Sequence, residues 1–180
     1  MTAFVSLFRA INVGGQRKVK MAELKELHES LGLENVFTYI QSGNVVFSSE
    51  EEDVERLRRQ IEDNFEQKFG FHSDVFVRSS DELGEIIEHN PFQNQPDKAP
   101  NWIVVMFLGT RPADAAQKNL LETYVGPEEI FVNGKELHVY YPDGIGRSKL
   151  MPGLIEKKLK TVGTARNWNT ILKLQELMQR

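Results

Sequence analysis

The chain has 180 residues and a net charge of −4, with 40% hydrophobic and 27% charged residues, a composition typical of a folded globular protein. It contains no cysteine, which excludes disulfides and thiolate metal sites. No apolar stretch approaches the roughly 20 residues that a membrane-spanning helix needs, and no signal peptide is recognisable, so we expect a cytoplasmic protein.

The first half of the chain predicts the order strand, helix, strand, strand, helix, strand. The expected elements are a strand at 3–8, a helix from Met21 to Gly32, strands at 36–40 and 45–47, a helix ending at Gly70, and a strand at 74–78. The helices are predicted from apolar residues at three- and four-residue spacing. Ser49 and Glu52 have the spacing of a capping box, which is expected to open the second helix. This order is the ferredoxin-like plan.

The second half repeats the order of elements without repeating the residues. A capping box of Ser79 and Glu82 predicts a short helix, and residues 90–101, with three prolines, predict a connection. Then follow a strand at 102–108, a helix from Pro112, strands at 129–132 and 136–141 around Asn133-Gly134, a helix from Leu150 to Gly163, the short GTARN and a last helix. Asn-Gly is a strong hairpin signal because both residues tolerate positive φ. The ferredoxin-like order requires a strand as its sixth element, and the sequence offers only the short GTARN segment at that place.

The sequence therefore predicts an α+β fold with two ferredoxin-like (βαββαβ, alpha-beta plait) halves in tandem. The first half is expected at residues 1–89 and the connection at 90–101. The second half, with the C-terminal helix, is expected at 102–180.

Four polar segments fall at the ends of predicted elements, where backbone N–H groups are unpaired and binding sites tend to be built. They are RAINVGG (9–15), QSGN (41–44), GRSKL (146–150) and TARNWNT (164–170). The candidate ligand-binding residues are Arg9, Asn12, Gly14, Gly15, Ser42, Asn44, Arg147, Ser148, Lys149, Arg166, Asn167 and Asn169. The glycines and asparagines also suit plain turns, and that alternative stays open.

TARNWNT is the strongest of these segments. Asn167 is well placed as the N-cap of the last helix, and Arg166 is expected at the exposed mouth of that helix. A helix N-terminus with an arginine beside it suits a phosphate or carboxylate. The structural alternative is a good cap with an arginine that pairs with a distant acid. Lys157, Lys158 and Lys160 are interpreted as a solvated helix face.

None of the four segments contains Asp, Glu, His or Cys, the residue types on which general-base catalysis and metal binding depend. The four histidines are isolated in the sequence. No P-loop, dinucleotide fingerprint or nucleophile elbow is present. No metal, cofactor or catalytic residue is therefore predicted, and Ser42, Ser148 and Lys149 could act as nucleophile or base only if the fold brought them together.

Binding without chemistry is the favoured function: a binding protein for a small anionic ligand, such as a nucleotide, a phosphorylated metabolite or a short RNA. One alternative is an enzyme acting on a phosphorylated or carboxylated metabolite through Ser42, Lys149 and Arg166. Another is a structural or partner-binding protein without a ligand. RNA readers of this topology present aromatic rings on their central strands, and Phe4, Phe8 and Phe47 are candidates, although a role in the core is the preferred interpretation. The sequence does not define an oligomeric state.

The polar segments also carry a family resemblance. LFRAINVGG followed by KVKMAEL, TYIQSGNVVF, NPF and TARNWNTILKL together resemble a widespread bacterial family of unknown function (DUF1697), from Val5 to Leu174. The resemblance implies a paired ferredoxin-like architecture. It implies no activity, and it transfers no catalytic residue.

Overall fold

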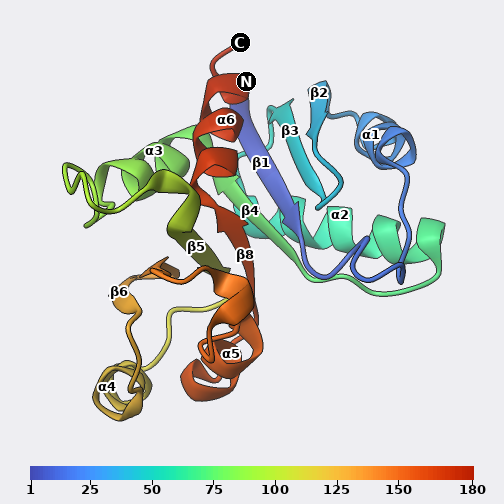
Figure 1. The fold of residues 1–180 in the computed structure, drawn as a ribbon. Helices are drawn as coiled ribbons and strands as arrows, with labels where there is room; N and C mark the ends of the chain where they lie inside the picture. The colour runs from blue at the N-terminus through green and yellow to red at the C-terminus, as the bar shows by residue number, and fades with distance from the viewer. The chain divides into compact units, whose positions relative to one another are not determined.

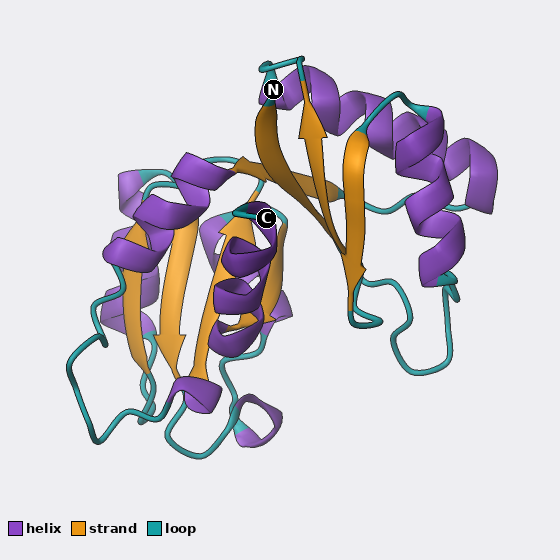
Figure 2. Ribbon diagram, turned by 90° about the horizontal axis from the view of Figure 1, so that it is seen from above, coloured by secondary structure: helices purple, strands orange, loops and turns teal.

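The computed structural model describes residues 1–180 and has a mixed α+β fold. It contains two four-stranded antiparallel sheets, each with helices (Figures 1 and 2). The chain divides into two compact units: Met1–Glu85 together with Lys173–Arg180 form the first, and Ile86–Leu172 form the second. Residues 90–101 belong to the second unit, and their predicted role as a connection between ferredoxin-like halves stays a prediction.

The first unit follows the predicted order of elements. They are β1 (Thr2–Phe8), α1 (Met21–Ser30), β2 (Glu34–Tyr39), β3 (Asn44–Ser49), α2 (Val54–Phe69), β4 (Val75–Ser79) and the start of α3 (Ser80–Glu88). The strands lie in the order β2-β3-β1-β4, with β1 antiparallel to both β3 and β4. The end of α6 completes this unit.

The second unit has the same arrangement of strands. After the end of α3 come η1 (Pro100–Trp102), β5 (Ile103–Leu108), α4 (Asp114–Thr123), β6 (Glu129–Asn133), β7 (Glu136–Tyr140), η2 (Ile145–Arg147), α5 (Pro152–Leu159), β8 (Gly163–Asn167) and most of α6 (Trp168–Met178). The strand order is β6-β7-β5-β8. The short GTARN segment is indeed the strand that completes the second sheet.

Each unit has its own apolar core. In the first, one face of the sheet packs with α1 and α2 through Phe4, Phe8, Val45, Phe47, Leu24, Leu27, Leu57, Ile61 and Phe65. In the second, the corresponding residues are Val104, Met106, Leu108, Leu137, Val139, Leu120, Ile155 and Leu159. Alternate residues of a strand share one face of the sheet, and residues three or four apart share one face of a helix. The apolar residues predicted at these spacings therefore face one another and form the two cores.

The aromatic rings considered for RNA stacking belong to the first core. Phe4, Phe8 and Phe47 are at most 1% exposed, and Phe4 stacks on Phe47 with ring centroids 5.7 Å apart. Rings so completely covered by protein present no face to a base, so the preferred interpretation as core residues is confirmed.

Three local expectations were wrong, each by a few residues. Helix α2 is capped by Asp53, whose carboxylate accepts hydrogen bonds from the first-turn amides. Ser49 ends β3, and its hydroxyl accepts from Glu51 N before the helix begins. Helix α5 ends at Leu159 because Lys160 adopts a left-handed conformation with φ of +55°. The β6–β7 turn is Gly134-Lys135, since Asn133 is still paired with the first residue of β7.

The second predicted capping box is confirmed. Glu82 N donates to Ser79 Oγ over 3.2 Å, and Ser79 N donates to Glu82 Oε2 over 2.8 Å. The side chains at both ends of the motif thus satisfy amides at the start of α3. None of the helices has the length and apolarity needed to cross a membrane.

Candidate functional site

Two of the predicted polar segments meet in the first unit, at the end of the sheet where β1 leads into α1. Phe8 N donates to Gly43 O over 2.9 Å, and Asn12 Nδ2 donates to Gln41 O over 2.8 Å. The antiparallel sheet causes this meeting, because the end of β1 lies beside the start of β3. RAINVGG and QSGN therefore form one continuous loop surface.

Asn12 holds this loop surface together. Its side-chain nitrogen also donates to Val19 O over 3.0 Å, and its side-chain oxygen accepts from Val19 N over 2.7 Å. Its backbone has a φ of +54°, a conformation that asparagine tolerates better than most residues. Both the nitrogen and the oxygen of the Asn12 side chain thus form hydrogen bonds. These bonds tie Asn12 to the backbone of Val19 and to the QSGN turn.

Asn12→Ala is expected to lower the free energy of unfolding by about 2 kcal/mol, because it leaves Val19 and Gln41 backbone groups without these side-chain partners. Urea denaturation measures the loss. Asn35→Ala is a matched control: Asn35 also has a positive φ, +49°, but donates only one long hydrogen bond, 3.4 Å, to Ser48. Equal losses in the two variants would contradict the bridging role of Asn12.

The QSGN turn is built in the same way. Asn44 is fully buried, and its Nδ2 donates to Tyr39 O and to Ser42 Oγ, each over 2.9 Å. Ser42 thus has its hydroxyl fixed within the turn, and Gly43 supplies the left-handed residue with φ of +80°. These contacts favour a turn role for the segment, and its predicted part in ligand binding stays a prediction.

The basic residues of the loop have different surroundings. Arg9 lies 3.8 Å from Asp74, and the Arg17 guanidinium lies 5.5 Å from the Phe71 ring centroid. Lys18 and Lys20 are exposed and form no ion pair. Gly14 and Gly15 are also exposed, with no atom within 4 Å of an added Cβ at either. The loop therefore offers positive charge on an open surface.

In the second unit, the GRSKL segment is tied to an acidic partner. Ser148 Oγ donates to Glu128 and accepts from Leu150 N over 2.9 Å, and Tyr124 donates to the other oxygen of Glu128 over 2.5 Å. Arg147 and Lys149 on either side are exposed. The serine hydroxyl holds the segment in place, and these basic side chains face solvent.

The structure places Arg166 in β8, paired with Val105, so the expectation of an exposed arginine at the helix mouth was wrong. The residue is 7% exposed. Its Nη1 donates to Thr164 Oγ1 over 2.7 Å and to Ala165 O over 2.9 Å. Burial lowers the pKa of Arg166 to about 10. Strand formation turned this side chain inward because alternate strand residues occupy opposite faces.

Asn167 is the N-cap of α6, as predicted. Its Oδ1 accepts from Asn169 N over 2.9 Å, and its Nδ2 donates to Asn101 O over 3.0 Å. Asn169 itself is exposed. Arg166 and Asn167 line a pocket of about 240 Å³ with Trp102 and with Ile145 of η2. The TARNWNT segment and the element that carries Arg147 therefore do meet, at a small and mainly apolar pocket.

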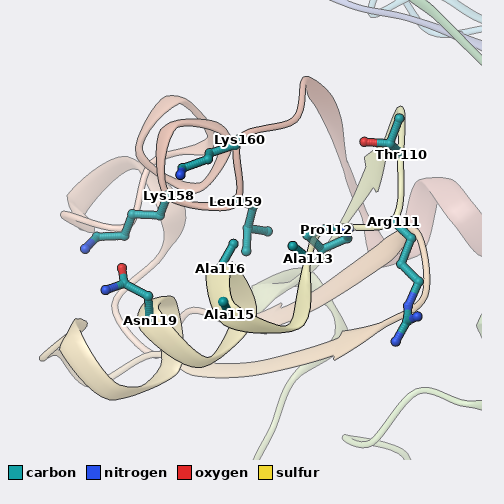
Figure 3. A pocket seen from close by; sticks show the side chains of 10 residues that line it. All are labelled: Thr110, Arg111, Pro112, Ala113, Ala115, Ala116, Asn119, Lys158, Leu159 and Lys160. Atoms are coloured by element: carbon teal, nitrogen blue, oxygen red, sulfur yellow. The ribbon is translucent and has the colours of Figure 1, made fainter.

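A larger pocket of about 530 Å³ in the second unit was missed by the sequence reasoning. It lies between α4 and the end of α5 (Figure 3) and is lined by Thr110, Arg111, Pro112, Ala113, Ala115, Ala116, Asn119, Lys158, Leu159 and Lys160. We call it the lysine pocket. Of the three lysines expected to form a solvated face, Lys158 and Lys160 line it, and Lys157 does not.

The charged side chains that line the lysine pocket are all basic. Lys158 and Lys160 project on the α5 side, and Arg111 stands at the other end with its guanidinium turned away from them (Figure 3). Lys158 Nζ donates to Thr123 Oγ1 over 3.0 Å, and Arg111 pairs with Asp114 over 3.2 Å. Small alanine side chains of α4 leave the space between these groups open.

Comparison with known proteins gives a family and a fold. A family model described as Protein of unknown function (DUF1697) matches residues 1–138. No curated protein matches the chain significantly. Among solved structures, a conserved bacterial protein from Streptococcus pneumoniae is similar over 98% of this chain and 98% of its own, with 23% sequence identity and a TM-score of 0.74. At this identity the similarity establishes the fold alone.

Proposed function

The chain belongs to the DUF1697 family of proteins of unknown function, and we propose that this member is a binding protein for a small anionic ligand that carries a phosphate group. The observation that supports this function is the lysine pocket, a concave site whose charged lining consists of Arg111, Lys158 and Lys160. A pocket with charge of one sign raises the local concentration of the opposite ion.

The start of α4 adds donors to the same pocket. No side chain caps this helix. The pocket is lined by Ala113, which directly precedes the helix, and by Ala115 and Ala116 of its first turn. Ala116 N already donates to Ala113 O over 3.0 Å. The amides available to an anion are therefore those before Ala116, and the partial positive charge at the start of a helix favours a bound anion. Lysine ammonium groups act as mobile point charges toward phosphate. The site thus combines two kinds of anion-binding group.

A small ligand fits these features better than a nucleic-acid backbone. The net charge of the chain is −4, whereas proteins that bind nucleic acid through its phosphates usually present a basic domain or stripe. A pocket of about 530 Å³ lies within the usual range for small-molecule sites. Nucleotides and phosphorylated metabolites are therefore the favoured ligands, and a short RNA is the weaker candidate.

The residues predicted from the sequence supply a second candidate surface for the same ligand class. In the first unit, Lys18 and Lys20 stand on the loop that Asn12 organises. The enzyme alternative, through Ser42, Lys149 and Arg166, is supported less well, because Ser42 holds a turn and Arg166 is buried. A cytoplasmic location remains part of this proposal.

We also infer that the two halves are ferredoxin-like repeats in tandem. The order β-α-β-β-α-β in each half and the matching strand orders β2-β3-β1-β4 and β6-β7-β5-β8 support this assignment. In both halves the connection after the first strand leads into the first helix. The basic loop 9–20 and the lysine pocket lie at these corresponding connections.

Thermal denaturation with inorganic phosphate, pyrophosphate or a nucleoside triphosphate tests the proposed function. We expect stabilisation of about 2.7 kcal/mol at a ligand concentration a hundredfold above Kd. That corresponds to a rise in Tm of several degrees, roughly 2–4 °C per kcal/mol for a chain of this length. The double variant Lys158→Ala/Lys160→Ala should lose most of this rise.

Lys157→Ala is the matched control, because Lys157 lies on the same helix but does not line the pocket. An equal loss of the ligand-induced shift in control and double variant would contradict a site at the lysine pocket. Loss of the shift in Lys18→Ala/Lys20→Ala alone would assign anion binding to the loop of the first unit. Turnover of a phosphorylated compound in the same samples would favour the enzyme alternative.

A further inference from the structure

Three potential metal ligands converge in the first unit, beside the end of the basic loop that carries Arg9. Glu62 comes from α2, and His72 and Asp74 come from the segment that leads into β4. One ligand atom from each lies within 4.8 Å of the other two. His72 Nε2 is 3.1 Å from Asp74 Oδ1. Because α2 and β4 are adjacent along the chain, the turn between them brings these side chains together.

The two carboxylates are held in place by groups other than the histidine. Glu62 Oε1 accepts from Val75 N over 2.8 Å, and its second oxygen pairs with Arg58. Asp74 is also 3.8 Å from Arg9. Both carboxylates can still use further lone pairs, since each oxygen accepts more than one contact. The acidic half of the cluster is therefore positioned before any ion binds.

Glu66 lies beside the other nitrogen of the imidazole. Its Oε2 lies 3.4 Å from His72 Nδ1, while His72 Nε2 points to Asp74. A neutral imidazole carries one N–H, so when Nδ1–H faces Glu66, the Nε2 lone pair faces a carboxylate oxygen. In that tautomer a metal ion fits between Nε2 and Asp74, whereas in the other tautomer Nε2–H donates to Asp74 directly. A carboxylate that accepts from the non-ligating nitrogen is the usual outer partner of a metal-bound histidine.

We propose that Glu62, His72 and Asp74 bind a divalent transition-metal ion, with Glu66 as the outer partner of the histidine. One imidazole nitrogen and two carboxylate oxygens suit zinc or a neighbouring metal, whereas calcium and magnesium prefer oxygen alone. Metal–ligand distances of about 2.0–2.2 Å require small adjustments of the three side chains. His72 can supply this movement because its side chain is 51% exposed. Water completes the coordination.

Calorimetric titration of the full chain with Zn²⁺ at about pH 8, where metal ligands are deprotonated, tests the site. We expect one saturable site, with Ca²⁺ and Mg²⁺ binding at least about tenfold more weakly. His72→Ala and Asp74→Asn should each weaken Zn²⁺ binding by about tenfold or more. Co²⁺ should give visible absorption bands that disappear in the same variants.

His89→Ala is the control for unspecific binding to an exposed histidine. Melting curves of the metal-free variants verify that each is folded, and Asp74→Asn retains the shape of the side chain if His72→Ala proves unstable. Absence of Zn²⁺ binding in the wild type, or equal binding in wild type, His72→Ala and Asp74→Asn, would overturn the proposal. The ligands lie in the first unit and the lysine pocket in the second, so either site can fail without the other.

Discussion

Gly43→Ala is expected to lower the free energy of unfolding by about 3 kcal/mol, since it combines backbone strain with overpacking. Gly43 has a φ of +80°, and an added Cβ would lie 2.5 Å from Ile11 Cδ1 and 2.9 Å from Phe8 Cβ. Ile11 can move the end of its side chain. Phe8 cannot move its Cβ without moving β1, whose backbone is bonded to Gly43 O. The substitution therefore pushes the QSGN turn away from the sheet.

Gly32→Ala separates the two contributions. Gly32 has nearly the same φ, +77°, but no atom lies within 4 Å of an added Cβ. We expect this control to lose only the conformational part, about 1 kcal/mol. Urea denaturation of both variants measures the difference. Equal losses would show that the contact of Gly43 with β1 contributes nothing to stability.

Acidification is expected to destabilise both units through buried histidines. Burial lowers the pKa of His28 in the first unit and of His138 in the second from 6.5 to about 4. As the pH falls below 6.5, the unfolded chain takes up protons that the folded chain excludes. The stabilisation is thus complete above pH 6.5 and is lost as the pH falls toward 4. Each histidine should account for about 3 kcal/mol between pH 7 and pH 4.

The hydrogen bonds explain why both rings are neutral in the fold. His28 Nδ1 lies 2.8 Å from Leu24 O and must donate to it, so Nε2 accepts from Ser6 Oγ at 2.9 Å. His138 Nε2 donates to Ile86 O over 3.2 Å, and its Nδ1 is buried without a hydrogen-bond partner. Neither ring contacts a carboxylate that would compensate a positive charge.

Urea denaturation between pH 7 and pH 4 measures this loss, and His28→Leu and His138→Leu should each remove about half of the histidine contribution. Tryptophan fluorescence reports the second unit, because Trp102 and Trp168 both belong to it, while far-UV circular dichroism reports the whole chain. The fluorescence-detected acid loss should shrink in His138→Leu. The same pH dependence in wild type and both variants would refute the assignment.

Local sequence patterns predicted most of the secondary structure. The apolar spacing of Leu24, Leu57 and Leu120 placed three helices, and each of these side chains is at most 1% exposed. The Ser79–Glu82 capping box and the Asn167 cap were also predicted correctly. In each of these features the interacting residues lie within a few positions of one another, so a short stretch of sequence is enough to predict them.

The local errors arose where two signals competed within a few residues. Ser49–Glu52 has the spacing of a capping box, but the pairing of Ser49 with Thr2 continues β3 to that residue, and Asp53 takes the cap. Asn133 likewise continues β6 by pairing with Glu136, which moves the turn to Gly134-Lys135. Strand pairing decided both boundaries, for Ser49 with a strand distant in sequence and for Asn133 within its own hairpin. Neither the capping-box spacing nor the Asn-Gly pair shows where the pairing of strands ends.

The sequence by itself determined the element order, the apolar faces and the polar segments at element ends, because periodicity and capping act over a few residues. Only the tertiary structure decided which of those segments meet. It buried Arg166 in a strand, brought Lys158 and Lys160 to the start of α4 and gathered Glu62, His72 and Asp74. The physical reason is that these side chains come from different elements, and the distances between them are set by strand pairing and helix packing across the unit.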